Sequence, residues 1–187
     1  MSGDGIEVPA GKLALVVTYL EMTKQPTDPG PPVPALKLAL LRAENPTVAF
    51  YRFLYDTVGG PWQWYERRRM DDDELAAIVQ DPAVEIYVLY VSGVPAGYSE
   101  LDLRKMPDIE VAYFGLMPEF IGRGLGTYLL RWTIDQAWTR EPKRLWVHTC
   151  NLDHPRSLGL YQRAGFTPYG QEASVIDDPR LDGSISG

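Results

Sequence analysis

A glycine-rich turn, Gly122-Arg123-Gly124-Leu125-Gly126-Thr127, lies between a run typical of a β-strand and a run typical of an α-helix. The strand-like run covers residues 109–116, and the helical run ends near Trp138. The first backbone N–H groups of a helix lack partners within the helix, and the helix dipole adds partial positive charge there. Glycines let a ligand come close to the backbone. The pattern therefore predicts a phosphate site formed mainly by main-chain amides.

Two common nucleotide-binding motifs do not fit this turn. Its glycines stand at positions 122, 124 and 126, whereas the dinucleotide-binding fingerprint requires G-x-G-x-x-G. The phosphate-binding loop of NTPases requires a lysine after its last glycine, but Thr127 and Tyr128 follow Gly126. Both motifs are therefore excluded as explanations of the turn.

The turn resembles the pyrophosphate loop of the Gcn5-related N-acetyltransferase (GNAT) superfamily, Q/R-x-x-G-x-G/A after a strand that ends in an apolar-x-Pro step. Here Leu116-Met117-Pro118 precedes Ile121-Gly122-Arg123-Gly124-Leu125-Gly126, with Ile121 in place of the usual Gln or Arg. A second block, from Asn151 to Phe166, is similar to the family pattern N-x-x-[N/H]-x-x-[A/S]-x-x-x-Y-x-x-x-G-F. The resemblance is detailed over residues 84–170 and holds in outline for the N-terminal half.

Periodicity and turn residues predict an α/β chain. We expect strands over 12–22, 36–43, 84–91, 96–103, 109–116, 144–150 and 166–175, and helices over 48–58, from Asp71 to before Pro82, from the glycine turn to Trp138, and over 155–164. Asn45 is expected to cap the first helix, with Pro46 at its first position. The resemblance implies a mixed, mostly antiparallel central sheet of six to seven strands, flanked by about four helices and splayed at the centre.

The length of 187 residues suits one domain. We expect this GNAT domain to cover residues 1–176, with an extra strand and a Pro-rich loop within residues 1–35. Residues 25–34 contain five prolines and one glycine, which excludes regular structure there. Residues 177–187 are expected to form a C-terminal tail.

Composition narrows the class of partner. The net charge of -7 disfavours binding to a phosphate backbone, although Arg67-Arg68-Arg69 is a local exception. No apolar stretch approaches the length of a membrane span, and no charged-then-apolar leader follows Met1. Cys150 is the single cysteine and has no partner for an internal disulfide. We therefore expect a cytoplasmic protein that binds neither nucleic acid nor a membrane.

The GNAT resemblance implies acetyl-CoA as the cosubstrate. Its pantetheine arm would lie in the splay between the 109–116 and 144–150 strands, against unpaired backbone groups near Leu116 and Met117. Its diphosphate would bind the amides of residues 122–127, with Arg123 adding positive charge. Asn151, Ser157 and Tyr161 are the remaining residues that the resemblance assigns to the cofactor.

Three residues are candidates for proton transfer. Tyr161 stands where GNAT enzymes place the acid that protonates the departing thiolate, and a phenol is close enough in pKa to a thiol for this role. The alternative is packing, since Tyr161 also falls on an apolar helix stripe. Glu110 precedes Gly124 by 14 residues, as the glutamate base of histone-type members does, and we expect water to relay the proton. Glu100, on the neighbouring strand, is the rival base.

Other chemically active residues lack a supporting pattern. His148, His154 and Cys150 have neither metal-site spacing nor the partners of a nucleophile, so we expect structural roles and no metal. The aromatic and basic segment Trp62 to Arg69 either holds an amine acceptor by cation-π contact or is a packed connector.

The resemblance implies transfer of an acetyl group from acetyl-CoA to a primary amine by direct attack. The acceptor is expected to be a small cationic amine or a peptide or protein amine, and a homodimer is also possible. The alternatives are a catalytically silent acyl-CoA-binding regulatory module and a protein-interaction scaffold. Thiol release across a panel of amines distinguishes these three.

Overall fold

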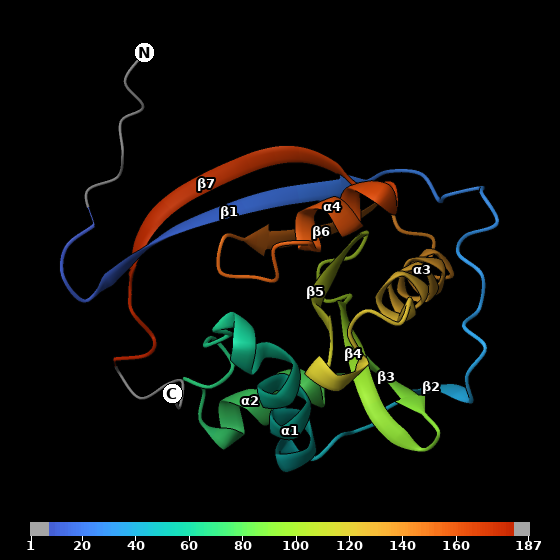
Figure 1. Cartoon of the computed structure of the whole chain (residues 1–187), viewed down its shortest axis with the longest axis horizontal. Coiled ribbons are helices and arrows are strands. Elements are labelled where there is room, and N and C mark those ends of the chain that lie inside the picture. The colour runs from blue at the N-terminus through green and yellow to red at the C-terminus, as the bar shows by residue number, and fades with distance from the viewer. Residues whose placement is uncertain (1–7, 182–187) are drawn as a thin grey trace.

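The computed structural model describes residues 8–181, which form an α/β fold around a seven-stranded mixed sheet (Figure 1). The strands are β1 (Lys12–Met22), β2 (Leu38–Arg42), β3 (Val84–Val91), β4 (Val94–Asp102), β5 (Asp108–Leu116), β6 (Arg144–Cys150) and β7 (Thr167–Asp177). The helices are α1 (Val48–Gly59), α2 (Asp72–Val79), α3 (Leu125–Trp138) and α4 (Ser157–Arg163), with short 3-10 turns η1 (Gly60–Trp62) and η2 (Pro118–Phe120). The predicted fold class is confirmed.

The sheet has the strand order β2-β3-β4-β5-β6-β1-β7. Neighbouring strands are antiparallel except β5 and β6, which pair in parallel only from Asp108 opposite Arg144 to Val111 opposite Val147. Beyond these pairs β5 stays bonded to β4, and β6 stays bonded to β1. Ala112 is an extra residue of β5 in its pairing with β4, a bulge at the place where the two central strands part. The predicted splay therefore lies between β5 and β6.

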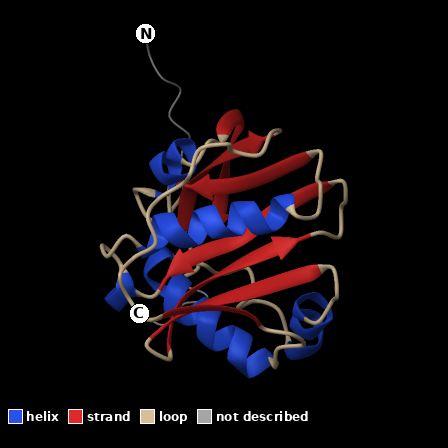
Figure 2. Ribbon diagram, turned by 90° about the vertical axis from the view of Figure 1, so that its right-hand side faces the viewer, coloured by secondary structure: helices blue, strands red, loops and turns tan. Residues whose placement is uncertain are grey.

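Helices cover both faces of the sheet (Figure 2). Apolar residues of α1 and α2, among them Leu54 and Leu75, pack with Ile86 and Tyr98 of the sheet. On α3 the residues predicted to face the sheet, including Leu130 and Ile134, are almost fully buried in a second cluster. The amphipathic patterns of α1 and α3 therefore correspond to buried faces on opposite sides of the sheet.

The start of α1 differs from the sequence prediction. Asn45 has a positive φ of 49°, and Thr47 is the capping residue, because its Oγ1 accepts the N–H of Phe50 at 3.2 Å. The helix begins at Val48 as expected, so Pro46 lies before it. In α2 the predicted acidic first turn is present, and Asp71 and Glu74 form a reciprocal capping box.

The two ends of the described chain lie together at one edge of the sheet. β1 and β7 pair from Lys12 opposite Asp177 to Glu21 opposite Thr167, so β7 extends two residues beyond its predicted end at Val175. Asp178 is buried, and its N–H donates to the carbonyl of Gly11 at 3.1 Å. The rest of the expected tail, residues 182–187, lies outside the described residues. Residues 25–34 contain neither helix nor strand, as predicted.

Candidate active site

The parting of β5 and β6 leaves a cavity of about 340 Å³. Its walls come from β1, β5 and β6, from the end of α1 and residues 62–66, from the glycine turn, and from α4 with the loop before it. Among the lining residues are Gly122, Gly124, Gly126, Thr127, His148, Ser157 and Tyr161, together with Glu66, Trp62, Trp64 and Asp153. The structure thus brings residues of the two sequence blocks, Ile121 to Gly126 and Asn151 to Phe166, to one site.

The glycine turn presents its amides without internal partners. None of the backbone N–H groups of residues 122–127 donates a hydrogen bond to any part of the chain from 8 to 181. Gly122 and Gly124 have φ of 85° and 75°, in the left-handed region, and a Cβ built on either would meet nothing within 4 Å. α3 starts directly after Gly124 and has no side-chain cap. The unpartnered amides expected at this helix start are present, and the binding of an anion by them stays a prediction.

Tyr161 lies on α4 and is almost fully buried against Phe114 and Phe166. It belongs to the apolar cluster that contains α3 residues, so the packing role expected of its ring is present. It also lines the cavity, and its hydroxyl has no hydrogen bond within the described chain. Burial raises the pKa of Tyr161, which keeps the phenol protonated at neutral pH. The ring of Tyr161 therefore packs in the core while its protonated hydroxyl remains available at the cavity.

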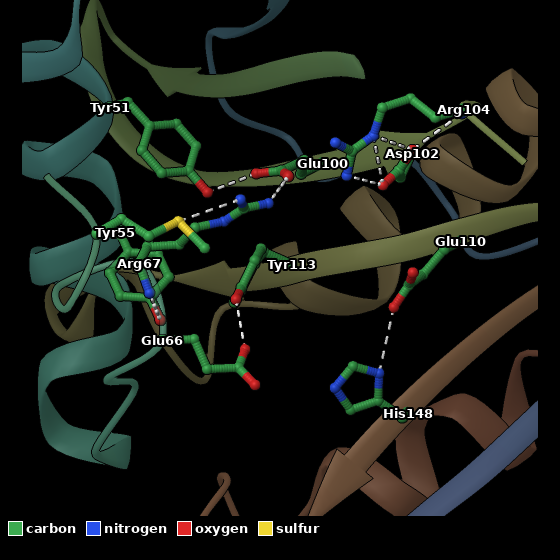
Figure 3. A network of polar contacts seen from close by, with 11 residues as sticks. Tyr51, Tyr55, Glu66, Arg67, Glu100, Asp102, Arg104, Glu110, Tyr113 and His148 are labelled. Atoms are coloured by element: carbon green, nitrogen blue, oxygen red, sulfur yellow. Dashed lines mark hydrogen bonds and ion pairs between the residues drawn. The ribbon is translucent and has the colours of Figure 1, made fainter. Parts of the chain in front are cut away.

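Glu110 of β5 and His148 of β6 face each other at the base of the splay (Figure 3). His148 Nδ1 lies 3.3 Å from Glu110 Oε1, a charge contact without the alignment of a good hydrogen bond. Glu110 raises the pKa of His148 against the opposing effect of burial. The histidine lines the cavity, whereas the carboxylate lies behind it.

Glu100 lies in a different environment, fully buried in the core (Figure 3). Arg67 Nη2 donates to Glu100 Oε1 at 2.7 Å, and the Tyr51 hydroxyl donates to Oε2 at 2.5 Å. Burial raises the pKa of Glu100, and Arg67 and Tyr51 oppose that rise. Glu100 is not among the cavity-lining residues, and its carboxylate is occupied by these two partners.

The segment between α1 and α2 covers the cavity and is bonded to its opposite side. Trp64 Nε1 donates to Asp153 Oδ1 at 3.0 Å, and Asp153 Oδ2 accepts from Thr149 and from the N–H of Cys150. The ring of Trp62 packs on His154 with 4.6 Å between centroids. The aromatic residues of this segment are therefore held against the loop that precedes α4.

A second carboxylate, Glu66, is held at the cavity wall. The Tyr113 hydroxyl of β5 donates to Glu66 Oε2 at 2.6 Å (Figure 3). The Tyr113 ring packs between Tyr55 and Trp64, at centroid distances of 5.1 and 5.2 Å. Glu66 and Asp153 thus place negative charge among aromatic rings, a setting that suits a cation.

Comparison with known proteins decides the family. A family model described as "Acetyltransferase (GNAT) family" matches residues 47–166, which is more than half of the chain. The chain belongs to the GNAT acetyltransferase family. The glycine turn, Tyr161 and the place where β5 and β6 part all lie within the matched residues.

Individual relatives of this GNAT chain are distant. It is 26% identical over 108 residues to a Bacillus subtilis (strain 168) protein named "Putative [ribosomal protein bS18]-alanine N-acetyltransferase", covering 58% of this chain and 70% of that one. A GCN5-related N-acetyltransferase from Sphaerobacter thermophilus has a TM-score of 0.63 at 16% identity, covering 92% of this chain and 55% of that one. The ribosomal-protein-S18-alanine N-acetyltransferase from Escherichia coli has a TM-score of 0.58 at 16% identity, covering 71% and 79%.

The chain therefore spans little more than half of some GNAT proteins that share its fold. A protein from Staphylococcus epidermidis ATCC 12228, described as functionally unknown and conserved, has a TM-score of 0.61 at 14% identity, covering 90% of this chain and 64% of that one.

Several residues expected at the cofactor site lie beside the GNAT cavity rather than in its wall. Asn151 Oδ1 accepts the N–H of Val16 and its Nδ2 donates to the carbonyl of Ala14, so both ends of its amide hold β1. Met117 is buried, and its N–H donates to the carbonyl of Ala96 at 2.9 Å. Leu125 is buried in the core under α3. Their side chains support the walls from behind.

The remaining cofactor candidates lie on the cavity or at its rim. Leu116, Thr127 and Ser157 line it. Arg123 stacks on Phe120, with 5.4 Å from Cζ to the ring centroid, and forms no ion pair within residues 8–181. Its charge is therefore available to a ligand bound at the glycine turn.

Sequence reasoning missed three polar residues of the site. His148 was expected to be structural, yet it lines the cavity and pairs with Glu110. Glu66 and Asp153 were not singled out as site residues, although both lie at its wall. The alternation of β6 predicts that His148 and Cys150 share a face, but only the β5–β6 register places Glu110 beside them.

Across residues 8–181, no three His, Cys, Asp or Glu side chains are grouped so that they could hold a metal ion. Within the same range, no helix has the length and apolar character needed to cross a membrane.

Proposed function

We propose that the protein is an acetyl-CoA-dependent N-acetyltransferase that acts on a primary amine. One observation carries the proposal: the glycine turn, whose backbone amides have no partner within residues 8–181, lines the same cavity as a tyrosine whose hydroxyl has no hydrogen bond in that range. A phosphate site alone would suit many ligands. A phosphate site that lies next to parted strands and to a proton donor suits a carrier with both a diphosphate and a thioester.

The site residues fit coenzyme A. The amides of residues 122–127 would bind its diphosphate, and the missing Cβ atoms of Gly122 and Gly124 leave room for close approach. Arg123 would add a charge-assisted contact. Along the splay, the edge of β5 beyond Val111 has no strand partner on the β6 side, so its backbone groups can pair with the amides of the pantetheine arm.

Acetyl-CoA, when bound, supplies the thioester that a neutral amine attacks. Tyr161 would protonate the departing sulfur, since its phenol remains protonated at neutral pH and opens onto the cavity. For proton removal from the amine we favour the part of the site that contains Glu110 over Glu100. Glu100 is buried and occupied by Arg67 and Tyr51, whereas Glu110 lies at the base of the splay beside a cavity residue.

The acceptor would be a small cationic amine or a peptide or protein amine. Glu66 and Asp153 can attract a positively charged group, and the rings of Trp62 and Trp64 can contact it by cation-π interaction. Two proteins similar to this chain are named as alanine N-acetyltransferases of ribosomal protein S18. A peptide beginning with alanine therefore belongs in any acceptor panel.

The test is thiol release from acetyl-CoA with polyamines, aminoglycosides, amino acids and peptides with free N-termini, together with calorimetry of acetyl-CoA binding. Product mass increased by one acetyl group for at least one amine supports the enzyme. Binding of acetyl-CoA without transfer to any amine would instead favour a silent regulatory module, and absence of binding would favour a scaffold.

A further inference from the structure

We propose that His148 is the catalytic base of this site, with its Nε2 taking the proton from the amine, and that Glu110 is a positioning residue behind it. The inference rests on the proposed acetyl transfer and assigns the proton acceptor within it. It changes the role expected for Glu110 from the sequence, because the carboxylate would act through the imidazole and not through water alone.

The placement of the two side chains supports these roles. His148 lines the cavity, whereas Glu110 does not. Glu110 Oε1 faces Nδ1 at 3.3 Å. A carboxylate at this distance favours a proton on Nδ1, and an imidazole protonated there keeps its lone pair on Nε2, so Glu110 favours the tautomer that a base needs. The pair comes from the two strands that part at the site: Glu110 is opposite Trp146 in the last part of the β5–β6 pairing, and His148 directly follows the last paired residue, Val147.

The charged and titratable groups around His148 support a base that works near neutral pH. Glu110 on β5 raises the pKa of His148 most, and burial opposes it. Glu66 from the α1–α2 segment and Asp153 from the loop after β6 add smaller contributions in the same direction. Tyr19 on β1 packs on the ring at 6.1 Å, with its hydroxyl directed to Glu172 of β7 at 3.2 Å. The groups from every neighbouring element are thus acidic or neutral.

His154 provides an internal comparison. It also lines the cavity, but its Nδ1 accepts the N–H of Arg156 at 3.0 Å and its ring packs on Trp62. No carboxylate forms an ion pair with it within the described residues. Of the two histidines in the chain, only His148 has the partner that a base needs.

The proposed acetyl transfer moves one proton from the amine to His148 and one from Tyr161 to sulfur. The neutral amine nitrogen forms a bond to the thioester carbonyl carbon, its N–H proton passes to Nε2 of His148, and the C–S bond breaks. Tyr161 gives its hydroxyl proton to the leaving sulfur. The imidazolium then returns its proton through solvent, which restores the tyrosine. The products are the amide and free coenzyme A, with no change in redox state.

The kinetic test compares the pH dependence of kcat/KM in the wild type, His148→Gln, Glu110→Gln and the control Glu172→Gln. The control removes a carboxylate from neighbouring β7 that contacts neither member of the pair. We expect His148→Gln to lower kcat by about 10² to 10⁴ fold, the usual contribution of a general base. In the wild type, protonation of His148 should lower kcat/KM at acidic pH, and this acidic limb of the profile should be absent in His148→Gln. In Glu110→Gln that limb moves to lower pH, because the base loses the charge that raises its pKa. The profile is measured with two acceptors whose amines differ in pKa, because a limb caused by the amine moves between them and a limb caused by His148 does not.

A second measurement does not depend on turnover. NMR titration of the two imidazoles, assigned with His154→Gln, gives the pKa of His148 directly, and Glu110→Gln must lower it. Acetyl-CoA affinity by calorimetry must remain within about twofold in His148→Gln, a difference below roughly 0.4 kcal/mol. These readouts distinguish a catalytic base from a residue that only supports the fold.

Three results overturn the inference. His148→Gln that keeps the wild-type kcat and acidic limb removes the base assignment. Full loss of activity in Glu110→Gln with activity retained in His148→Gln makes Glu110 the base through water. A wild-type protein that binds acetyl-CoA but acetylates no amine overturns the proposed function itself, and with it the role of His148, while the NMR result still reports whether the pair exists.

Discussion

Arg67 and Glu100 form an ion pair inside the core, with 2.7 Å between Nη2 and Oε1 and both side chains at most 7% exposed. Arg67 belongs to the segment that covers the cavity, and Glu100 belongs to the central strand β4. The pair therefore attaches that segment to the sheet beneath it, while Tyr51 of α1 saturates the other carboxylate oxygen. This ion pair explains a buried glutamate at position 100 without any catalytic role.

Glu100→Gln is expected to destabilise the fold without changing the acidic limb of the pH profile. Removing one member of a buried ion pair leaves the other charge uncompensated, at a cost of about 3 to 5 kcal/mol. Urea unfolding measures the loss, and Arg67→Met combined with Glu100→Gln should cost less than the sum of the single changes. A stable, folded Glu100→Gln protein that has lost the acidic limb would make Glu100 the base.

Gly124→Ala is expected to weaken acetyl-CoA binding by roughly ten- to hundredfold, equivalent to the loss of one charge-assisted hydrogen bond of about 1.5 to 3 kcal/mol. At φ of 75° an added methyl group strains the turn and projects into the space left for the ligand. Calorimetry with acetyl-CoA measures the change.

The matched control is Gly93→Ala, at φ of 86° in the β3–β4 turn, where a Cβ also meets nothing within 4 Å. It carries similar backbone strain away from the cavity, so acetyl-CoA affinity should not change. Equal loss of affinity in both variants would mean that strain, and not the glycine turn, explains the effect.

The sequence was sufficient for those parts of the site that depend on local chain geometry. The glycine turn is set by adjacent residues, because two positive φ values and a helix start follow directly from Gly122, Gly124 and the apolar run after them. Tyr161 could be placed for a similar reason, since one short helix holds it. The β3–β4 hairpin at Ser92-Gly93 and the acidic first turn of α2 were likewise predicted from residues adjacent in the sequence.

The parts that were missed depend on contacts between distant segments. Asn151 was expected at the ligand, but the pairing of β1 beside β6 supplies a backbone that satisfies its amide. His148 was assigned to structure because neither metal-site spacing nor the partners of a nucleophile surround it, and Glu110 reaches it only through the β5–β6 register. Glu66 gains its partner Tyr113 from a strand 47 residues away. The periodicity of apolar residues predicts which face of a helix or strand is buried, but it does not predict which other element packs against that face.

Trp64→Phe is expected to loosen the segment over the cavity. The change keeps an aromatic ring but removes the hydrogen bond from Nε1 to Asp153 at 3.0 Å, which should lower the free energy of unfolding by about 1.5 to 3 kcal/mol. We expect a higher KM for the amine with little change in acetyl-CoA affinity. Trp132→Phe is the control, since Trp132 packs on Tyr87 away from the cavity. An unchanged amine KM in Trp64→Phe would remove the segment from acceptor binding.

Tyr161→Phe should lower kcat by about 10² to 10⁴ fold while stability changes by less than about 0.5 kcal/mol. The hydroxyl has no hydrogen bond to lose within residues 8–181, and the ring keeps its contacts with Phe114 and Phe166. Single-turnover kinetics and thermal unfolding measure the two quantities, with Tyr169→Phe on the exposed strand β7 as control. A fully active Tyr161→Phe enzyme would leave the packing of the ring as the only role of this residue.

The stability of the fold should depend on pH through His148. The pKa of this histidine is raised in the folded protein, chiefly by Glu110, so the folded state binds its proton more tightly than the unfolded state does. The resulting stabilisation is fully present below the unfolded pKa of about 6.5 and is lost as the pH rises through the folded value. Because the two side chains are 35% and 20% exposed, solvent screening keeps the effect small. Urea unfolding of wild type and His148→Gln between pH 5 and 9, values chosen to bracket the pKa of about 6.5, should therefore give a stability difference in favour of the wild type that shrinks with rising pH. A difference that grew with pH would mean that His148 is stabilised in its neutral form, and the ion pair with Glu110 would not exist in solution.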